Sequence, residues 1–188
     1  MGGAEPDVII GATDIADAWL IDIEPQRDER GFFARTWCQR ELSARGLSTD
    51  IAQESISFSR RRATMRGLHF QRPPHDEVKI VRCLHGAIFD VIVDLRRESP
   101  TFMKWQGFEL TADSRRALYV PKGCAHGFLT LADECEVSYL ISAFYVSEAA
   151  AGYRHNDPAF GIRWPLAIAV ISERDSTWPD FDPRAPWG

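Results

Sequence analysis

The sequence predicts a single all-β domain of the sandwich or barrel type. Short apolar runs rich in β-branched and aromatic residues recur through most of the 188 residues, as strands require. Turn-forming stretches separate these runs at the short intervals seen in sandwiches and barrels. Only residues 36–46 (TWCQRELSARG) have a helical pattern, and the glycine that closes this stretch is a common helix stop.

The strands are expected in the following order. Residues 66–86 (RGLHFQRPPHDEVKIVRCLHG) have the composition of a pair of strands with a proline-flanked loop between them. Residues 88–95 (IFDVIVDL) are rich in β-formers, and Phe89, Val91 and Val93 share one face. Four further short strands follow, at FELTA (108–112), RALYVP (116–121), GFLTLA (127–132) and EVSYLISAFY (136–145).

Nothing in the rest of the chain indicates a second domain. From Ser172 onward the sequence is rich in proline and aspartate, which predicts an irregular C-terminal segment. Repeats and low-complexity tracts are absent, so residues 1–188 are expected to form one domain. No C-x-x-C pair occurs, which argues against a zinc knuckle or a redox motif. We expect free thiols in a reducing compartment for the four cysteines, Cys38, Cys83, Cys124 and Cys135.

Composition narrows the function classes. Apolar residues make up 45% and charged residues 26%, which is ordinary for a soluble globular protein. The formal net charge of −5 argues against a nucleic-acid partner, which would need a basic stripe. The first twenty residues lack the basic region of a signal peptide, and no apolar run is long enough to span a membrane. We therefore expect a cytoplasmic protein with neither a nucleic-acid nor a membrane partner.

Two clusters of residues could carry chemistry. Residues 66–86 hold three of the five histidines together with Glu77, a combination that raises the question of a metal site. The second cluster is YVPKGCAHGF at 119–128, a P-x-G-x-x-H turn. This turn resembles the second motif of the cupin barrels, in which the histidine, here His126, points into the barrel.

The first cluster departs from a metal-binding pattern. Metal-binding cupins carry an H-x-H in their first motif, whereas this chain has His69-Phe70-Gln71. Glutamine is a poor transition-metal ligand beside imidazole. His75 lies in the proline-flanked loop and would have to fold back to replace the missing ligand. We therefore predict a site that holds no metal.

Several motifs in one order resemble the dTDP-4-dehydrorhamnose 3,5-epimerase family. The motifs are DERGFF (28–33), RGLHFQ (66–71), KIVRCLHGAIFDVIVDLRRESPTF (79–102), VPKGCAHGF (120–128), YRHNDPAFGIRWP (153–165) and SERD (172–175). The resemblance spans nearly the whole chain. It implies a cupin-type jelly roll that needs no metal or other cofactor, and a homodimer in which strands are exchanged between the subunits.

The resemblance also implies a reaction and roles for four residues. A 4-ketone in the sugar acidifies the hydrogens on C3 and C5, so a base on one face and an acid on the other can invert those carbons. His69 would be the base, oriented by Asp175, and Lys79 would stabilise the enolate oxygen. Tyr139 would be the acid. From the residues alone, period-two alternation turns both Lys79 and Tyr139 towards the interior.

The nucleotide-sugar substrate carries a diphosphate, and binding residues follow from the same resemblance. Arg66 and Arg30 are the expected diphosphate ligands, because a guanidinium binds phosphate oxygens in pairs. The other residues expected in the substrate pocket are Phe33, Gln53, His126 and Tyr145.

Three positions depart from the family pattern. Arg35 stands where a glutamate is common, and Phe144 stands where a tyrosine commonly precedes Tyr145. Residues 75–78 read HDEV in place of a glutamine-containing run before Lys79. The acid–base residues are unaffected, so the sequence constrains the reaction type more closely than the nucleotide or the sugar.

Two other functions fit parts of the sequence. One is a metal-dependent cupin enzyme that would use His69, His75, Glu77 and His126 as ligands. The other is a sugar-nucleotide-binding cupin without catalytic activity, although binding alone needs neither a base with its aspartate nor an opposed tyrosine. The sequence leaves open whether C3, C5 or both are inverted.

Overall fold

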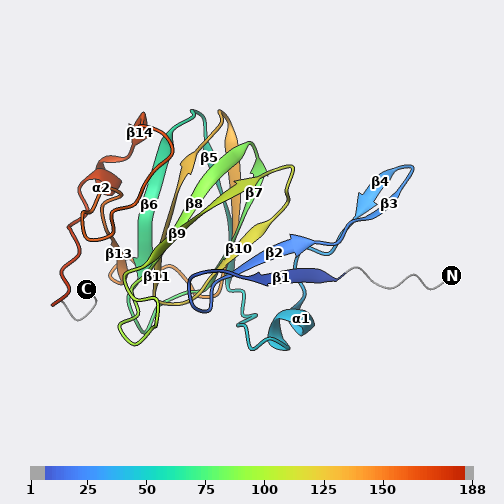
Figure 1. Cartoon of the computed structure of the whole chain (residues 1–188), viewed down its shortest axis with the longest axis horizontal. Coiled ribbons are helices and arrows are strands. Elements are labelled where there is room, and N and C mark those ends of the chain that lie inside the picture. Colours follow the sequence, from blue (N-terminus) through green and yellow to red (C-terminus); the bar gives the residue numbers. More distant parts are fainter. Residues whose placement is uncertain (1–6, 185–188) are drawn as a thin grey trace.

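The structure, a computed structural model, describes residues 7–184, and its main feature is a pair of β-sheets packed face to face (Figure 1). The first sheet has the strand order β1 (Val8–Ala12), β2 (Trp19–Ile23), β10 (Ala117–Val120), β7 (Lys79–His85), β12 (Cys135–Ile141), β5 (Gln53–Ser59). The second has the order β13 (Ala150–Gly152), β6 (Thr64–Gln71), β11 (Cys124–Thr130), β8 (Ala87–Asp94), β9 (Trp105–Thr111). The all-β jelly roll expected from the sequence is confirmed.

The space between the two sheets is the main hydrophobic core. Buried side chains from facing strands fill it, among them Val81, Ile92, Phe128 and Val137. On β7 and β12 the inward residues are the odd-numbered ones, which also include Lys79 and Tyr139. The alternation of these two strands therefore brings two polar side chains to the inside of the sandwich.

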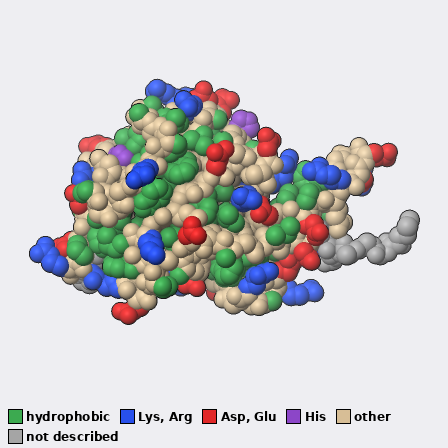
Figure 2. Space-filling view, viewed as in Figure 1, with side chains coloured by type: hydrophobic (Ala, Val, Ile, Leu, Met, Phe, Trp, Pro, Cys, Tyr) green, Lys and Arg blue, Asp and Glu red, His purple; other side chains and the backbone are tan. Residues whose placement is uncertain are grey.

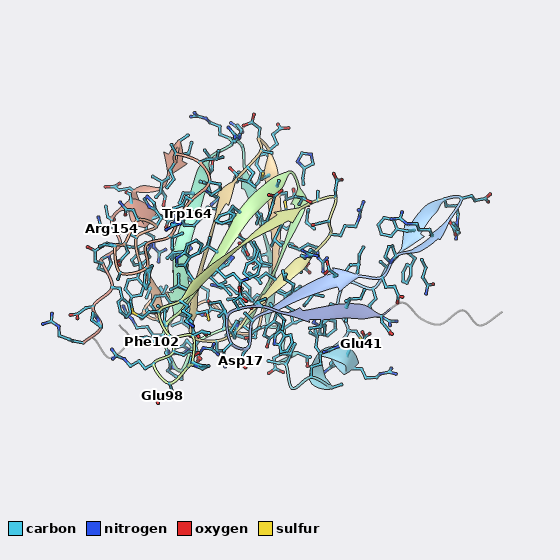
Figure 3. All side chains as sticks on the ribbon, viewed as in Figure 1. Asp17, Glu41, Glu98, Phe102, Arg154 and Trp164 are labelled. Carbon is cyan, nitrogen blue, oxygen red and sulfur yellow. The ribbon has the colours of Figure 1, made fainter. Side chains whose placement is uncertain are left out.

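The outer face of the second sheet is covered by the C-terminal segment. Val91 and Val93 of β8 point to this side and pack in a second core with Tyr153 and Phe160. Trp164, labelled in Figure 3, packs edge-on against Phe89 with ring centroids 6.1 Å apart. The face predicted for residues 88–95 is thus buried on the outside of the sandwich, under the chain that follows β13.

The segment from Ser172 onward is mostly irregular, as the sequence predicted, apart from the short helix α2 (Glu173–Ser176). Just before this segment, β14 (Val170–Ile171) pairs in parallel with β6. The predicted helix at 36–46 is present but shorter, as α1 (Gln39–Ser43).

The predicted strand boundaries shift by several residues. The run predicted at 108–112 belongs to β9, which begins at Trp105, and the run at 136–145 belongs to β12, which ends at Ile141. The remaining strands at the N-terminal side, including β1 and β2, were not predicted. α1 docks beneath β1 through buried Leu42, and Glu41 accepts a 2.7 Å hydrogen bond from the Val8 N–H (Figure 3).

One element stands clear of the sandwich. β3 (Gln26–Asp28) and β4 (Gly31–Phe33) form a two-stranded hairpin that projects away from both sheets (Figures 1 and 2). All six of its strand residues are exposed. Among residues 7–184, no helix is long and apolar enough to cross a membrane.

Candidate active site

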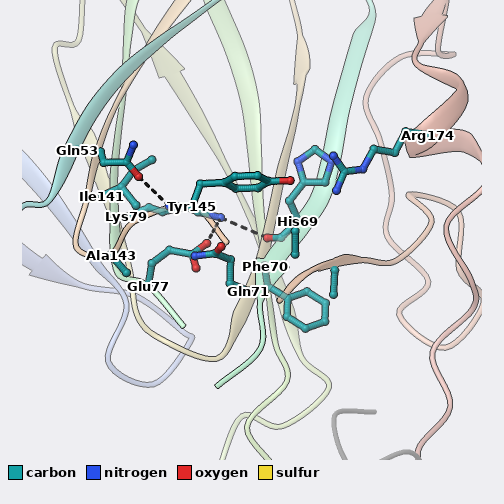
Figure 4. Close-up of a pocket in the computed structure, with 12 residues that line it drawn as sticks. Gln53, His69, Phe70, Gln71, Glu77, Lys79, Ile141, Ala143, Tyr145 and Arg174 are labelled. Atoms are coloured by element: carbon teal, nitrogen blue, oxygen red, sulfur yellow. Dashed lines mark hydrogen bonds and ion pairs between the residues drawn. The ribbon is translucent and has the colours of Figure 1, made fainter. Parts of the chain in front are cut away.

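A cleft opens between the two sheets, and it consists of two adjoining cavities that share His69, Lys79 and Ile141. The inner cavity has a volume of about 330 Å³ and is also lined by Arg66, His126, Tyr139 and Asp175, along with residues of β5. The side cavity has a volume of about 210 Å³ (Figure 4). Its further lining includes Gln53, Gln71, Glu77, Tyr145 and Arg174.

A histidine–carboxylate pair lies where the two cavities meet. His69 Nε2 is 2.7 Å from Asp175 Oδ1. The imidazole is 43% exposed, whereas the carboxylate is only 7% exposed. A carboxylate can only accept a hydrogen bond, so Nε2 carries a proton, and in the neutral form of the ring Nδ1 keeps its lone pair. The pair can therefore present a base to the cleft.

The environment of Asp175 keeps its carboxylate charged. Burial alone would raise the pKa of Asp175, but hydrogen bonding and charge attraction from His69, together with the Gly67 N–H, outweigh burial and lower it. The Gly67 nitrogen lies 3.2 Å from Oδ2, and the Ser172 hydroxyl caps α2 by accepting from the Asp175 N–H at 3.0 Å. These contacts fix the carboxylate against the His69 ring.

A bulge in β6 brings Arg66 and His69 to the same side of the sheet. His126 of β11 pairs with His69, whereas Phe128, two residues on, pairs with Arg66, three residues back. The extra residue on β6 shifts the alternation of side chains, as a bulge does. Gly67 lies in this bulge at φ +127°, where an added Cβ would come within 2.5 Å of the Gly127 Cα. Only glycine fits there.

Lys79 lies deeper in the cleft beside a buried carboxylate. Its Nζ is 3.0 Å from Glu77 Oε1, and the two side chains are 12% and 5% exposed. The ammonium also lies 3.4 Å from the His69 carbonyl oxygen (Figure 4). The cation is thereby held against the backbone of β6, and Lys79 lines both cavities.

Tyr139 lines the inner cavity from the opposite sheet. Its hydroxyl is 3.1 Å from the Ser57 Oγ of β5. Burial raises the pKa of Tyr139 well above its ordinary value, despite the hydrogen bond with Ser57. The phenol therefore keeps its proton at any working pH and can donate it. An imidazole on β6 and a phenol on β12 thus line two walls of one cavity.

His126 forms a second, fully buried histidine–carboxylate pair. Its Nε2 lies 2.7 Å from Asp90 Oδ1, and the two side chains are 5% and 0% exposed. The Asp90 Oδ2 atom has no hydrogen-bond partner in the part of the chain that the structure describes. The His126 ring meets the Tyr139 ring edge-on, with centroids 6.3 Å apart. His126 therefore packs against Tyr139 where both line the inner cavity.

Comparisons with known proteins identify the family. The sequence profile described as dTDP-4-dehydrorhamnose 3,5-epimerase matches residues 12–183. The chain belongs to this family. It is 40% identical over 183 residues to the dTDP-4-dehydrorhamnose 3,5-epimerase of Sinorhizobium fredii, covering 96% of this chain and 94% of the relative.

Solved structures of the family superpose on nearly the whole chain. The Bacillus anthracis epimerase, solved with TDP and PPi bound, is 38% identical with a TM-score of 0.89, over 93% of this chain and 100% of that one. The Legionella pneumophila epimerase, solved with dTDP-4-keto-L-rhamnose, is 33% identical with a TM-score of 0.83, over 90% of each chain. At these identities the likeness extends beyond the fold to the family itself.

The family-derived candidates fall into two groups. Eight of the ten line the cleft just described: His69, Lys79, Tyr139, Asp175, Arg66, His126, Gln53 and Tyr145. Arg30 and Phe33 do not, because they lie on the projecting hairpin. The Arg30 side chain is 85% exposed and pairs with Asp28. Within a single chain, the structure does not bring these two residues to the cleft.

The other departures from the family pattern also have defined places. Arg35 lies 3.5 Å from Glu41 of α1, so its charge has a partner within the chain. Phe144 is 69% exposed on the segment that follows β12. Glu77, from the unusual HDEV stretch, is the partner of Lys79 described above.

The ligand set of a metal-dependent enzyme is not assembled in the described part of the chain. No three side chains among the histidines, cysteines and acids of residues 7–184 are grouped to hold a metal ion. Three of the four residues in that hypothesis have other partners: His69 pairs with Asp175, Glu77 with Lys79, and His126 with Asp90.

The sequence did not point to several residues that shape the cleft. Trp178 packs edge-on against His69, with ring centroids 6.4 Å apart, and Arg174 lies over the same indole at 5.0 Å. An added Cβ at Gly152 would come within 2.6 Å of that indole. Only the cluster of tryptophan and charged residues in the tail hinted at Trp178 and Arg174, and no periodicity applies to an irregular segment.

Proposed function

We propose that the protein inverts C3, C5 or both in a nucleotide-diphospho-4-keto-6-deoxy sugar. The expected reaction converts dTDP-4-dehydro-6-deoxyglucose to dTDP-4-dehydrorhamnose, as the names of the relatives suggest. The observation that carries the proposal is the His69–Asp175 pair on one wall of the inner cavity and protonated Tyr139 on another.

The first step is removal of a proton next to the ketone. Neutral His69 accepts the proton from the sugar carbon at Nδ1, and the electron pair of the broken C–H bond moves towards the carbonyl. Asp175 stabilises the imidazolium that results. Lys79 lies beside His69 and offsets the negative charge that forms on the enolate oxygen.

The second step returns a proton from another wall of the cavity. Tyr139 donates its phenolic proton to the same carbon, the carbonyl re-forms, and the configuration is inverted. The phenolate recovers a proton from solvent, and the imidazolium releases one, so no group is consumed. Arg66 supports binding of the diphosphate, since its guanidinium is braced at the cavity by Ser59 Oγ at 3.0 Å and the Phe58 carbonyl oxygen at 2.8 Å.

The exposed hairpin supports the expected homodimer with exchanged segments. Arg30 and Phe33 are exposed on a hairpin that projects away from both sheets, and two short strands are not stable alone. The first sheet also exposes apolar side chains on its outer face, namely Ile56, Phe58 and Leu84. We infer that the hairpin reaches the cleft of a second copy, where Arg30 and Phe33 complete the substrate pocket.

The expected cellular location also remains a proposal. All four cysteines are free thiols, and three of them are buried. Free cysteines without disulfides are typical of a reducing compartment. This supports a cytoplasmic location.

The test is proton exchange followed by NMR in heavy water, with dTDP-4-keto-6-deoxyglucose as substrate. His69→Asn should lose deuterium incorporation at C3 and C5 by ~10²–10⁴-fold, the usual effect of losing a general base. Tyr139→Phe should still incorporate deuterium while forming little inverted product. Exchange in His69→Asn above about a tenth of the wild-type rate contradicts the assignment of the base.

A further inference from the structure

The chain leaves the sheet after Ile141, and the segment that follows forms a wall of the side cavity. Residues 142–146 continue from β12 but pair with no strand. Ala143 and Tyr145 line the side cavity, and the Tyr145 residue is 60% exposed. Backbone groups without a strand partner need other hydrogen bonds to stay in place. Two glutamine side chains supply them.

Gln71 binds the backbone of this segment with both atoms of its amide. Its Nε2 donates to the Phe144 carbonyl oxygen at 3.2 Å, and its Oε1 accepts from the Val146 N–H at 2.7 Å. One amide thus contacts a carbonyl and an N–H two residues apart, as a neighbouring strand would. Nε2 also donates to the His75 carbonyl oxygen at 2.9 Å, which ties in the proline-flanked loop.

Gln53 contacts the residue in between. Its Oε1 accepts from the Tyr145 N–H at 2.9 Å (Figure 4). Gln71 is 6% exposed, and all three of its hydrogen bonds go to the protein backbone. Its amide is therefore occupied in holding neighbouring segments.

We infer that Gln71 is a positioning residue that holds the Tyr145 segment as a wall of the substrate cleft. The inference rests on the proposed function. Only a primary amide offers a donor and an acceptor side by side at this spacing. Glutamate keeps the length but has no donor, and leucine has neither group. The position that carries a metal ligand in other cupins is used here to shape the pocket.

The experiment compares Gln71→Leu and Gln71→Glu with wild type. Both variants should raise KM for dTDP-4-keto-6-deoxyglucose by about tenfold or more, while deuterium incorporation at saturating substrate stays within about threefold. Amide hydrogen exchange of Tyr145 and Val146 in the substrate-free protein should rise by about tenfold or more. Gln106→Leu is the matched control, since Gln106 binds the Asp14 N–H at 2.8 Å far from the cleft. This control substitution should change neither KM nor the amide exchange of Tyr145 and Val146.

The outcomes separate a positioning role from a structural one. A general loss of stability would lower the active fraction and leave the KM of the folded enzyme unchanged. A KM within about threefold of wild type overturns the inference, whatever the exchange rates. If Gln71→Leu does not fold, Gln71→Glu decides, because it keeps the length and the acceptor for Val146. If wild type itself shows no deuterium incorporation, the proposed function has failed, and the amide-exchange comparison still tests whether Gln71 holds the segment.

Discussion

Four pairs of side chains in the cleft have fixed contacts, and each partner shapes the chemistry of the other. The pairs are His69 with Asp175, Lys79 with Glu77, His126 with Asp90, and Tyr139 with Ser57. Buried charges are costly unless they are paired. The pairing therefore lets a cation, a base and an acid lie close together inside a β-sandwich whose other inward residues are mostly apolar.

Substitutions in the Lys79–Glu77 pair should affect the free energy of unfolding and the enzymatic activity differently. Lys79→Met leaves the Glu77 carboxylate buried without a counter-ion, which should lower the free energy of unfolding by about 3–5 kcal/mol. The double variant Lys79→Met/Glu77→Gln removes both charges and should recover most of that loss. It should stay inactive, because no cation remains beside the enolate. Urea unfolding and the deuterium assay measure the two effects.

A surface ion pair provides the control for this comparison. Arg116 and Asp22 lie 2.7 Å apart with side chains 40% and 34% exposed. Arg116→Met should cost less than about 1 kcal/mol, as exposed pairs usually do. If Lys79→Met/Glu77→Gln were no more stable than Lys79→Met alone, the buried charges of Lys79 and Glu77 would not be coupled.

At the scale of single residues, period-two alternation predicted the orientation of some side chains but not of others. Period-two alternation correctly placed Lys79 and Tyr139 on the inner face of their strands. It could not find Glu77, because that residue precedes β7 and no period applies to the loop. The resemblance to the family suggested the pairing of His69 with Asp175, which no local pattern contains.

At the scale of elements, the bulge in β6 is the clearest feature that sequence patterns cannot show. Strict alternation would turn Arg66 and His69, three residues apart, to opposite faces. The extra residue near Gly67 reverses that, and it leaves the Gly67 N–H to bind Asp175. The sequence contains the glycine but gives no sign of which strand it faces, because the close neighbour is Gly127 of another strand.

The serine cap of α2 is expected to support catalysis through Asp175. Ser172→Ala removes the acceptor for the Asp175 N–H and should cost about 1 kcal/mol of local stability, as capping losses do. The carboxylate would then lie less firmly against His69, so we expect kcat to fall about fivefold with KM nearly unchanged. Steady-state kinetics measure this.

A second serine of the same helix is the matched control. The Ser176 hydroxyl donates to the Glu173 carbonyl oxygen at 2.8 Å and is exposed. Ser176→Ala should leave kcat at the wild-type value. Equal effects of the two substitutions would mean that the helix as a whole, and not its cap, is what matters.

At the scale of the whole molecule, the proposed dimer with exchanged hairpins predicts a recovery of activity that separate chains could not show. Arg30→Ala and His69→Asn should each be nearly inactive as homodimers. Co-expressed as a mixture, they should regain about a quarter of wild-type activity, because half of the dimers are mixed and each mixed dimer has one intact cleft. Recovery occurs only if Arg30 of one chain serves the cleft of the other.

The same mixture distinguishes the alternative arrangement. If the hairpin folded back onto its own chain, every cleft in the mixed dimer would carry one of the two defects. Activity would then stay at the level of the separate variants. Differential tags purify the mixed dimer, and light scattering measures its mass.

Acid stability should depend on two buried carboxylates. For both Asp94 and Asp175 burial raises the pKa, but hydrogen bonds, from Arg96 to Asp94 and from His69 to Asp175, outweigh it and bring the pKa below the ordinary value of 3.8. A lowered folded-state pKa stabilises the protein above the unfolded value, and this contribution is lost as the pH falls through the folded value.

The variant Asp175→Asn checks this linkage by urea unfolding between neutral pH and about pH 3. Its deficit in unfolding free energy relative to wild type should be constant above about pH 5 and should shrink below pH 4. A deficit that stayed the same at every pH would mean that the charge of Asp175 contributes nothing to stability.

The distance along the chain between His69 and Asp175, the proposed catalytic pair, has a consequence for protein synthesis. His69 and Asp175 lie 106 residues apart, so at roughly 5–20 residues per second the ribosome makes the carboxylate about 5–20 s after the imidazole. Before that interval ends, the nascent chain already holds Lys79 and Tyr139, yet its histidine has no partner. Catalytic competence therefore arrives late in translation, when the last-made part of the barrel wall has paired with β6.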